Sequence, residues 1–286
     1  MSYYIIIPAH NEEAYLPLTL DTIQKQSLLP KKVIIVNDNS NDQTEEIINS
    51  YVKKSNLFLK LNTNSTEEHL PGSKVIKAFN KGLSVVNEDF DFIVKLDADL
   101  ILPYDYFETI ADAFSRNPFV GIVGGFIYEK NINGNWVLNH PMNKIHVRGA
   151  FKAYSKKCFK AIGGLKPAMG WDTLDELLAQ YHEYRILTIE DLKVKHLRPT
   201  GNAYNTKAKL LQGQAMYGMG YGFWLTVIAS LKMASKQKSS KTFIHNLKGF
   251  IKAKQEGQPL LVNKEEAAFI KNLRWRGITN KIQGKI

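Results

Sequence analysis

One stretch of this sequence carries both a fold signal and a chemical signal: Phe92-Ile93-Val94-Lys95-Leu96-Asp97-Ala98-Asp99-Leu100-Ile101-Leu102-Pro103. Its first part is rich in β-forming apolar residues and predicts a buried strand, which Asp97 and Asp99 follow directly. Two carboxylates at the end of a buried strand are costly without a cationic partner, and a divalent ion bound to phosphate oxygens is one such partner. The alternative is a solvated turn with two surface acids, because Asp-x-Asp alone is a weak motif.

The composition is that of a globular protein with a sizeable core, with 44% hydrophobic residues among 286. This length suits one large α/β domain with an appendage, or two small domains. Cys158 is the only cysteine, so no intrachain disulfide can form, which favours a reducing, cytoplasmic compartment. No secretory leader is expected before the first predicted strand, and the apolar stretch from Phe223 to Leu231 is about half of a membrane span.

The positive charge is concentrated at the C-terminal end of the chain. Residues 1–227 contain 25 Lys and Arg against 24 Asp and Glu, a net of +1, whereas residues 228–286 contain 13 against 3, a net of +10. A neutral body with a basic tail predicts an anionic partner, which could be a membrane surface, nucleic acid or an anionic substrate.

The first fifty residues predict a β-α-β unit. An apolar strand is expected at 3–7, ended by Pro8, and a second at 33–36, with an amphipathic helix between them that carries Leu16, Leu20 and Ile23. Such a unit implies parallel pairing of its two strands. Polar residues follow each strand, and Asp38 is among them, either as a site residue or as part of a helix cap or turn.

The rest of the chain alternates between strand and helix patterns. Further strands are expected at 58–61, 120–128, 136–138, 186–189 and 194–199, and further helices at 74–83, 106–115, 156–161, 170–184 and 208–231. The strands at 186–189 and 194–199 are expected to be neighbours, Asn133-Gly134 is expected to turn a hairpin, and the Lys/Ser-rich residues 232–241 are expected to form a loop. Lys74 lies near a helix start, where a bound anion would explain it; the alternative is a solvated lysine.

A basic amphipathic helix is expected after this loop. Its apolar stripe consists of Phe243, Leu247, Phe250 and Ile251, and lysines lie around the remainder of the helix. The stripe predicts either attachment to an anionic membrane surface or packing against the catalytic domain.

Several motifs agree in order and spacing with a known family. They are Pro8-Ala9-His10-Asn11-Glu12-Glu13, Val36-Asn37-Asp38-Asn39-Ser40, Pro71-Gly72-Ser73-Lys74 through Asn80-Lys81-Gly82, Leu96-Asp97-Ala98-Asp99, Gly163-Gly164 and the acidic patch Trp171–Glu176. Over residues 1–200 the chain resembles the family 2 glycosyltransferases, which have the nucleotide-sugar-binding fold called GT-A. The resemblance implies an α/β fold with a mixed, mainly parallel sheet flanked by helices, whose first half is Rossmann-like. It divides the chain into a catalytic domain, 1–205, and a helical, basic C-terminal extension, 206–286.

The chain departs from the family pattern in two places. The usual Glu-Asp pair is replaced by Asp172-Thr173-Leu174-Asp175-Glu176, which leaves the identity of the catalytic base open. The Gln-x-x-Arg-Trp element of processive synthases has no match at Gln212-Gly213-Gln214, which argues against a synthase that threads its product through a membrane.

The resemblance implies a nucleotide site lined by Pro8, Ala9, Glu12, Asp38, Lys74 and Asp97. In this site Asp38 would accept hydrogen bonds from the N–H groups of the base. Lys74 would meet the ribose or the diphosphate, and Asp97 would hold ribose or sugar hydroxyls.

The resemblance also implies a divalent metal cofactor, Mn2+ or Mg2+. Asp99 would bind the ion, which bridges both phosphates and neutralises charge on the leaving diphosphate. His196 is a candidate for a further metal ligand, and the alternative is a histidine without metal.

An inverting transfer needs a carboxylate base on the acceptor side of the sugar. Asp175 is the first choice for this base and Asp172 the second; the alternative for either is an acid favoured by a helix N-terminus. Arg148 and Trp171 are candidates for contacts with the acceptor or the donor sugar, although Trp171 could equally be a packing residue.

The predicted function is a metal-assisted, inverting glycosyltransferase of the hexosyl- or N-acetylhexosaminyl-transferase class, acting in envelope glycan, polysaccharide or glycolipid synthesis. Its partners would be a nucleotide-diphospho-sugar, with UDP favoured, and a saccharide or lipid-linked acceptor. Its location would be cytoplasmic or peripheral on the inner face of the cytoplasmic membrane, where it could meet an anionic membrane surface.

Two other functions are considered. A nucleotidyltransferase of the same fold would carry a glycine-rich phosphate loop after the first strand, and Pro8-Ala9-His10-Asn11 is not such a loop. A nucleic-acid-binding module would interleave aromatic and basic residues in the tail, where Trp275 between Arg274 and Arg276 is the only such cluster.

Overall fold

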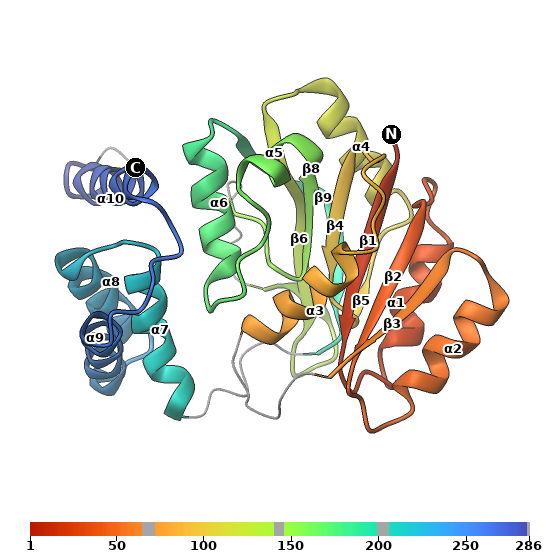
Figure 1. Ribbon diagram of the computed structural model, residues 1–286, viewed down its shortest axis with the longest axis horizontal. Coiled ribbons are helices and arrows are strands. Elements are labelled where there is room, and N and C mark those ends of the chain that lie inside the picture. The colour runs from red at the N-terminus through yellow and green to blue at the C-terminus, as the bar shows by residue number, and fades with distance from the viewer. Residues whose placement is uncertain (65–71, 140–145, 199–205, 285–286) are drawn as a thin grey trace.

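A nine-stranded mixed sheet forms the centre of the computed structural model, which describes residues 1–64, 72–139, 146–198 and 206–284. The strands lie in the order β3-β2-β1-β4-β8-β6-β9-β5, and β7 pairs with β6 outside this path. Four C-terminal helices gather beside α6 (Trp171–Tyr181), at the opposite side of the molecule from β3 (Figure 1). Pro71 and Pro199, and the expected domain boundary at 205, lie outside the described residues.

The first half of the sheet is parallel and has the predicted β-α-β architecture. It consists of β1 (Tyr3–Ala9), β2 (Lys32–Asp38), β3 (Phe58–Thr63) and β4 (Phe92–Leu96), connected by α1 (Leu16–Gln24), α2 (Thr44–Lys54) and α3 (Ser73–Leu83). All five residues of β4 are buried, and the rings of Phe92 and Tyr3 stack 4.5 Å apart. β1 continues through Pro8, where the sequence predicted its end; Pro8 is tolerated because β4 pairs with β1 only as far as Ile6.

The second half of the sheet is mixed. It contains β5 (Leu100–Ile101), β6 (Val120–Lys130), β7 (Trp136–Leu138), β8 (Phe151–Ser155) and β9 (Arg185–His196), with α4 (Tyr106–Arg116), α5 (Lys156–Ala161) and α6. The hairpin predicted at Asn133-Gly134 joins β6 to β7. The prediction of two neighbouring strands at 186–189 and 194–199 is wrong, because both segments pair with β6 as one strand, and residues 190–192 bulge out between them.

The C-terminal region contains α7 (Thr206–Gly218), α8 (Phe223–Lys236), α9 (Ser240–Gln255) and α10 (Lys264–Ile282). The single helix expected over 208–231 is therefore wrong: it breaks where Gly220 and Gly222 have positive φ angles of 72° and 76°. The loop expected at 232–241 is also wrong, because Lys and Ser do not stop a helix and only 237–239 connect α8 to α9.

The apolar stripe predicted on α9 is divided between packing and exposure. Phe250 is buried and contacts the ring of Tyr217 on α7, whereas Ile251 is 42% exposed. Phe243 and Leu247 are half-buried. None of the helices in the described part of the chain is both long and apolar enough to cross a membrane.

Two glycines allow α7 and α9 to approach closely. A Cβ atom on Gly249 would lie 2.0 Å from the Leu210 carbonyl oxygen, and one on Gly213 would lie 1.9 Å from the Asn246 carbonyl oxygen. Because the obstructing atoms belong to the backbone, no side-chain rotation could relieve either clash.

We expect Gly249→Ala to lower the free energy of unfolding by about 2 kcal/mol, because the two helices must separate to admit the methyl group. The matched control is Gly277→Ala in α10, where an added Cβ meets nothing within 4 Å. That change should raise the free energy of unfolding by ~0.5 kcal/mol through helix propensity. Urea denaturation of both variants measures the difference; equal effects would contradict the close crossing of α7 and α9.

Candidate active site

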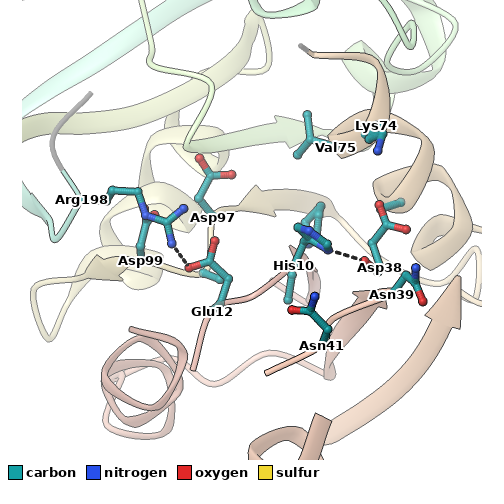
Figure 2. Close-up of a pocket in the computed structure, with 14 residues that line it drawn as sticks. His10, Glu12, Asp38, Asn39, Asn41, Lys74, Val75, Asp97, Asp99 and Arg198 are labelled. Atoms are coloured by element: carbon teal, nitrogen blue, oxygen red, sulfur yellow. Dashed lines mark hydrogen bonds and ion pairs between the residues drawn. The ribbon is translucent and has the colours of Figure 1, made fainter. Parts of the chain in front are cut away.

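A cavity of about 530 Å³ lies at the carboxyl ends of β1, β2 and β4 (Figure 2). Strand order reverses at β1, since β2 and β3 lie on one side of it and β4 on the other, and ligands of open α/β sheets bind at such points. All six predicted nucleotide residues and the predicted metal ligand that follows β4 line this cavity: Pro8, Ala9, Glu12, Asp38, Lys74, Asp97 and Asp99.

The loops that follow β1 and β2 are bonded to each other. Asn11 and Asn39 have positive φ angles of 54° and 53°, conformations that asparagine tolerates better than most residues. The backbone N–H of Asn41 donates to the Asn11 side chain at 2.9 Å, and the N–H of Glu12 donates to Thr44 Oγ1 at 2.7 Å. These bonds hold the two loops that line the cavity against each other without a bound ligand.

Three carboxylates crowd one side of the cavity. Figure 2 shows Glu12, Asp97 and Asp99 there with Arg198, facing His10, Asp38 and Lys74 across the space. Burial raises the pKa of Glu12 to about 7 against the effect of Arg198, and the charges of Asp99 and Asp97 add to the rise. Burial also raises the pKa of Asp97, although Lys95 opposes this. An additional cation at this side would therefore be stabilised by three nearby acids.

Asp99 and His196 fit the divalent ion that the family resemblance implies. Asp99 is 7% exposed, and its Oδ1 is buried without a hydrogen-bond partner among the described residues. His196 Nε2 lies 3.3 Å from Asp99 Oδ2, and its Nδ1 lies 3.2 Å from Glu129 Oε1, so a carboxylate orients the ring as in many histidine metal ligands. Burial acts to lower the pKa of His196, but the two carboxylates outweigh it and hold this pKa above its usual value.

The described residues contain no group of three His, Cys, Asp or Glu side chains arranged to hold a metal by themselves. A carboxylate and an imidazole would have to share the ion with ligand oxygens, as is common where Mg2+ binds a phosphate-bearing substrate.

A second cavity of about 550 Å³ adjoins the first, and Val75 and Asp97 line both. Its lining includes the predicted sugar-side residues Arg148 and Trp171, the second-choice base Asp172, and His196. Gln212 of α7 also lines it, so the C-terminal helices contribute to this cavity. The two adjoining cavities are here called the cleft; Glu12 and Asp99 line the first part, Asp172 lines the second, and Asp97 lines both.

Two buried lysines lie under Trp171. Lys95 of β4 and Lys152 of β8 are cross-strand partners, 2% and 0% exposed, and their Nζ atoms lie 5.3 and 5.9 Å from the Trp171 ring centroid. Lys95 pairs with Asp97 and donates to the Gly149 carbonyl at 2.9 Å, whereas Lys152 donates to the Asp172 carbonyl at 2.5 Å. The two lysines therefore bind Asp97, which lines both cavities, and the start of α6, which lines the second, from neighbouring positions on β4 and β8.

The structure does not bring Asp175, the first choice for the base, into the cleft. Asp175 is 3% exposed and lines neither cavity; it pairs with Lys152 at 2.9 Å and accepts a hydrogen bond from Tyr154 at 2.5 Å. Burial raises its pKa to about 7 despite the Lys152 charge. Glu176 also pairs with Lys152 at 2.9 Å and lies 2.9 Å from His146, so both acids belong to a buried network. Asp172, three residues earlier on α6, is the acid of this patch that lines the cleft.

Four polar residues of the first cavity were not among the predicted site residues: His10, Asn39, Asn41 and Arg198. The first three lie in the polar loops after β1 and β2, and their position beyond a strand end was a usable signal. Arg198 pairs with Glu12 at 2.6 Å, and no local pattern connects two residues so far apart in the sequence.

Comparison with known sequences identifies relatives. A family model described as Glycosyl transferase family 2 matches residues 4–169. An uncharacterized glycosyltransferase of Mycoplasma genitalium is 26% identical over 273 residues, covering 86% of this chain and 87% of that protein. The poly(ribitol-phosphate) beta-N-acetylglucosaminyltransferase TarS of Staphylococcus aureus is 32% identical over 119 residues, covering 40% of this chain. The poly-beta-1,6-N-acetyl-D-glucosamine synthase of Staphylococcus epidermidis is 27% identical over 121 residues, covering 42% of this chain. These matches span only 18% of TarS and 27% of the synthase.

Solved structures share the fold. TarS 1-349 in complex with UDP-GlcNAc aligns with a TM-score of 0.57 at 20% identity, covering 94% of this chain and 78% of that one. A mannosyltransferase of Pyrobaculum calidifontis in complex with GDP-Man and Mn2+ aligns with a TM-score of 0.57 at 16% identity, covering 96% and 80% of the two chains. At these identities the likeness establishes the GT-A-like fold. The family match favours glycosyl transfer over the other two functions considered.

We expect Lys152→Met to lower the free energy of unfolding by about 3–5 kcal/mol, because it leaves two buried acids without their cation. Lys157→Met on α5 is the matched control, since Lys157 is exposed and makes no ion pair within the described residues. Guanidinium denaturation compares the two. A Lys152→Met protein as stable as the control would mean that the network under Trp171 contributes nothing.

Proposed function

The chain belongs to glycosyl transferase family 2 and is a glycosyltransferase, and we propose that it transfers a sugar from a UDP-sugar to a hydroxyl acceptor with inversion. One observation carries this proposal: the cavity at the ends of β1, β2 and β4 adjoins a second cavity lined by Asp172. This arrangement provides one space for a nucleotide and another, with its own carboxylate, for an acceptor. UDP-GlcNAc, which the TarS structure contains, is the first donor to test.

In this proposal the first cavity holds the nucleotide. Asp38, at the end of β2, accepts hydrogen bonds from the base, as a carboxylate suits a pyrimidine N–H. Lys74, in the first turn of α3, meets the ribose or the diphosphate together with the N–H groups of the helix start. Asp97 is one-third exposed, and Lys95 fixes its orientation for contact with ribose or sugar hydroxyls.

Asp99 and His196 are proposed to hold Mn2+ or Mg2+. Support comes from the orphaned Asp99 Oδ1, from the acid-rich surroundings and from the Mn2+ in the related mannosyltransferase structure. A divalent ion bound there would neutralise charge on the leaving diphosphate.

Asp172 is proposed as the base, in place of Asp175. It lies in the first turn of α6, where Lys152 fixes its backbone carbonyl, and it lines the acceptor-side cavity. Taking the proton of the acceptor hydroxyl there, opposite the diphosphate, permits a single displacement, which inverts the anomeric carbon. Arg148 and Trp171 are proposed to contact the sugar or the acceptor, since both line the same cavity.

The acceptor is proposed to be a saccharide or a lipid-linked saccharide of envelope synthesis. A lipid-linked acceptor would require the enzyme to work at the inner face of a membrane, and the basic C-terminal helices suit contact with that anionic surface. We assign catalysis to residues 1–205, with Gln212 of the 206–286 extension completing the acceptor cavity.

Asp99→Ala is expected to weaken Mn2+-dependent UDP binding by about 100-fold, because it removes a charged metal ligand. Calorimetry of UDP binding with Mn2+ and with EDTA measures this without requiring turnover. Asp112→Ala, an exposed acid on α4, is the control. UDP binding that is indifferent to EDTA in the wild type would refute the metal assignment while leaving the nucleotide site open to test.

Asp172→Asn is expected to lower the rate of sugar transfer, measured as cleavage of the UDP-sugar, by about 10³-fold. The affinity for UDP should not change, because the base acts on the acceptor. Asp175→Asn should instead lower the free energy of unfolding and retain turnover in the folded fraction. Single-turnover kinetics and urea denaturation of both variants test this pair. The reverse pattern would identify Asp175 as the base.

A further inference from the structure

The apolar stretch from Phe223 to Leu231 contains no charged residue, and the proposed site makes no use of it. In the structure it forms most of α8, and three of its residues lie along one face at a spacing of four and three: Trp224, Ile228 and Leu231, here called the α8 stripe. Trp224 is 70% exposed and Leu231 53% exposed. Large apolar side chains so exposed and aligned mark an interaction surface.

Helix α10 contacts α8 and the segment that precedes it. A Cβ on Gly220 would lie 2.7 Å from Ala267, and one on Gly222 would lie 3.7 Å from Lys271. The Arg274 guanidinium lies 5.5 Å from the Tyr221 ring, so the residues just before α8 pack against α10.

Four cations gather where these helices meet: Lys232, Lys236, Arg274 and Lys281, here called the basic patch. Lys232 directly follows Leu231 and precedes Lys236 by one helical turn. The charge of Lys281 is the largest cause that lowers the pKa of Lys232, followed by partial burial and then by Lys236 and Arg274. None of the four forms an ion pair with an acid among the described residues. Uncompensated like charges repel, and an anionic partner would relieve that repulsion.

We infer that the α8 stripe and the basic patch together form a docking surface for a membrane containing anionic lipids. Apolar side chains bordered by cations are the features by which helices bind in the plane of such a membrane, and tryptophan favours the interface. The aliphatic members of the stripe gain by burial among acyl chains, which a nucleic-acid backbone cannot offer. The proposed surface lies on α8 and α10, whereas the stripe predicted from the sequence, either for membrane attachment or for packing, lies on α9.

This inference depends on the proposed function in one respect: the reason for membrane binding would be access to a lipid-linked acceptor. The surface itself is argued from exposure and charge. A measurement of membrane binding can therefore fail or succeed independently of the transferase assay.

The test is co-sedimentation of the full chain with vesicles of phosphatidylcholine and phosphatidylglycerol, and with vesicles of phosphatidylcholine alone. The wild type should pellet with the anionic vesicles and be released by salt. Lys232→Gln/Lys281→Gln should weaken binding by about 30-fold, which corresponds to ~1 kcal/mol for each basic residue. Trp224→Ser should weaken binding by about tenfold, because it removes apolar burial without altering charge.

Two controls match these variants. Lys241→Gln/Lys248→Gln removes the same charge from exposed positions on α9, and Phe119→Ser removes an aromatic side chain that is 61% exposed elsewhere. Both should bind vesicles as the wild type does, and all variants should bind UDP as the wild type does. Equal losses in control and patch variants would overturn the inference, as would a wild type that ignores anionic vesicles. Retention of a single-stranded oligonucleotide with the same residue dependence, without vesicle binding, would assign the patch to nucleic acid.

Discussion

The parallel pairing of β1 with both β2 and β4 is the constraint on which the candidate active site depends. Parallel strands end at the same edge of a sheet, so the residues after each strand meet there, however far apart they are in the sequence. Ala9, Asp38 and Asp97 reach one cavity for this reason. The hydrogen bonds between the loops after β1 and β2 then fix this edge, and α3 adds Lys74 from above it.

A second constraint joins the two halves of the cleft. Lys95 and Lys152 are direct partners across the β4–β8 pair, so their side chains emerge on one face of the sheet. Each buried ammonium requires a carboxylate: Lys95 pairs with Asp97, and Lys152 pairs with Asp175. The pairing of β4 with β8 thereby fixes the position of Asp97 relative to the start of α6, which carries Asp172. A network of this kind holds positions only while all its charges are matched.

The C-terminal helices have an inner surface that packs within the fold and an outer surface that faces solvent. Their inner surface is structural: glycines let α7 and α9 meet backbone to backbone, and α7 brings Gln212 to the cleft. Their outer surface leaves Trp224 and Leu231 of α8 exposed. Lys232 and Lys236 of α8 and Lys281 of α10 are exposed as well, whereas Arg274 is half-buried. The four cations of the basic patch form no ion pair among the described residues, whereas Lys252 of α9 pairs with Glu256.

The sequence by itself determined the strands and helices of the first half, the parallel β-α-β start and the residues at the strand ends, because periodicity and strand-end polarity are local properties. It could not determine that 186–189 and 194–199 form one strand, because the common partner β6 is distant in the chain. The sequence favoured Asp175 over Asp172 as the base, but it could not show which of the two faces the cleft, because both lie on α6. Asp175 pairs with the buried Lys152 of a distant strand and lines neither cavity, whereas Asp172 lines the second. The sequence also could not predict that Arg198 pairs with Glu12, or which face of α8 is exposed. In each case the outcome depends on which surfaces the tertiary fold covers, and burial of one residue by another far away in the chain leaves no local trace in the sequence.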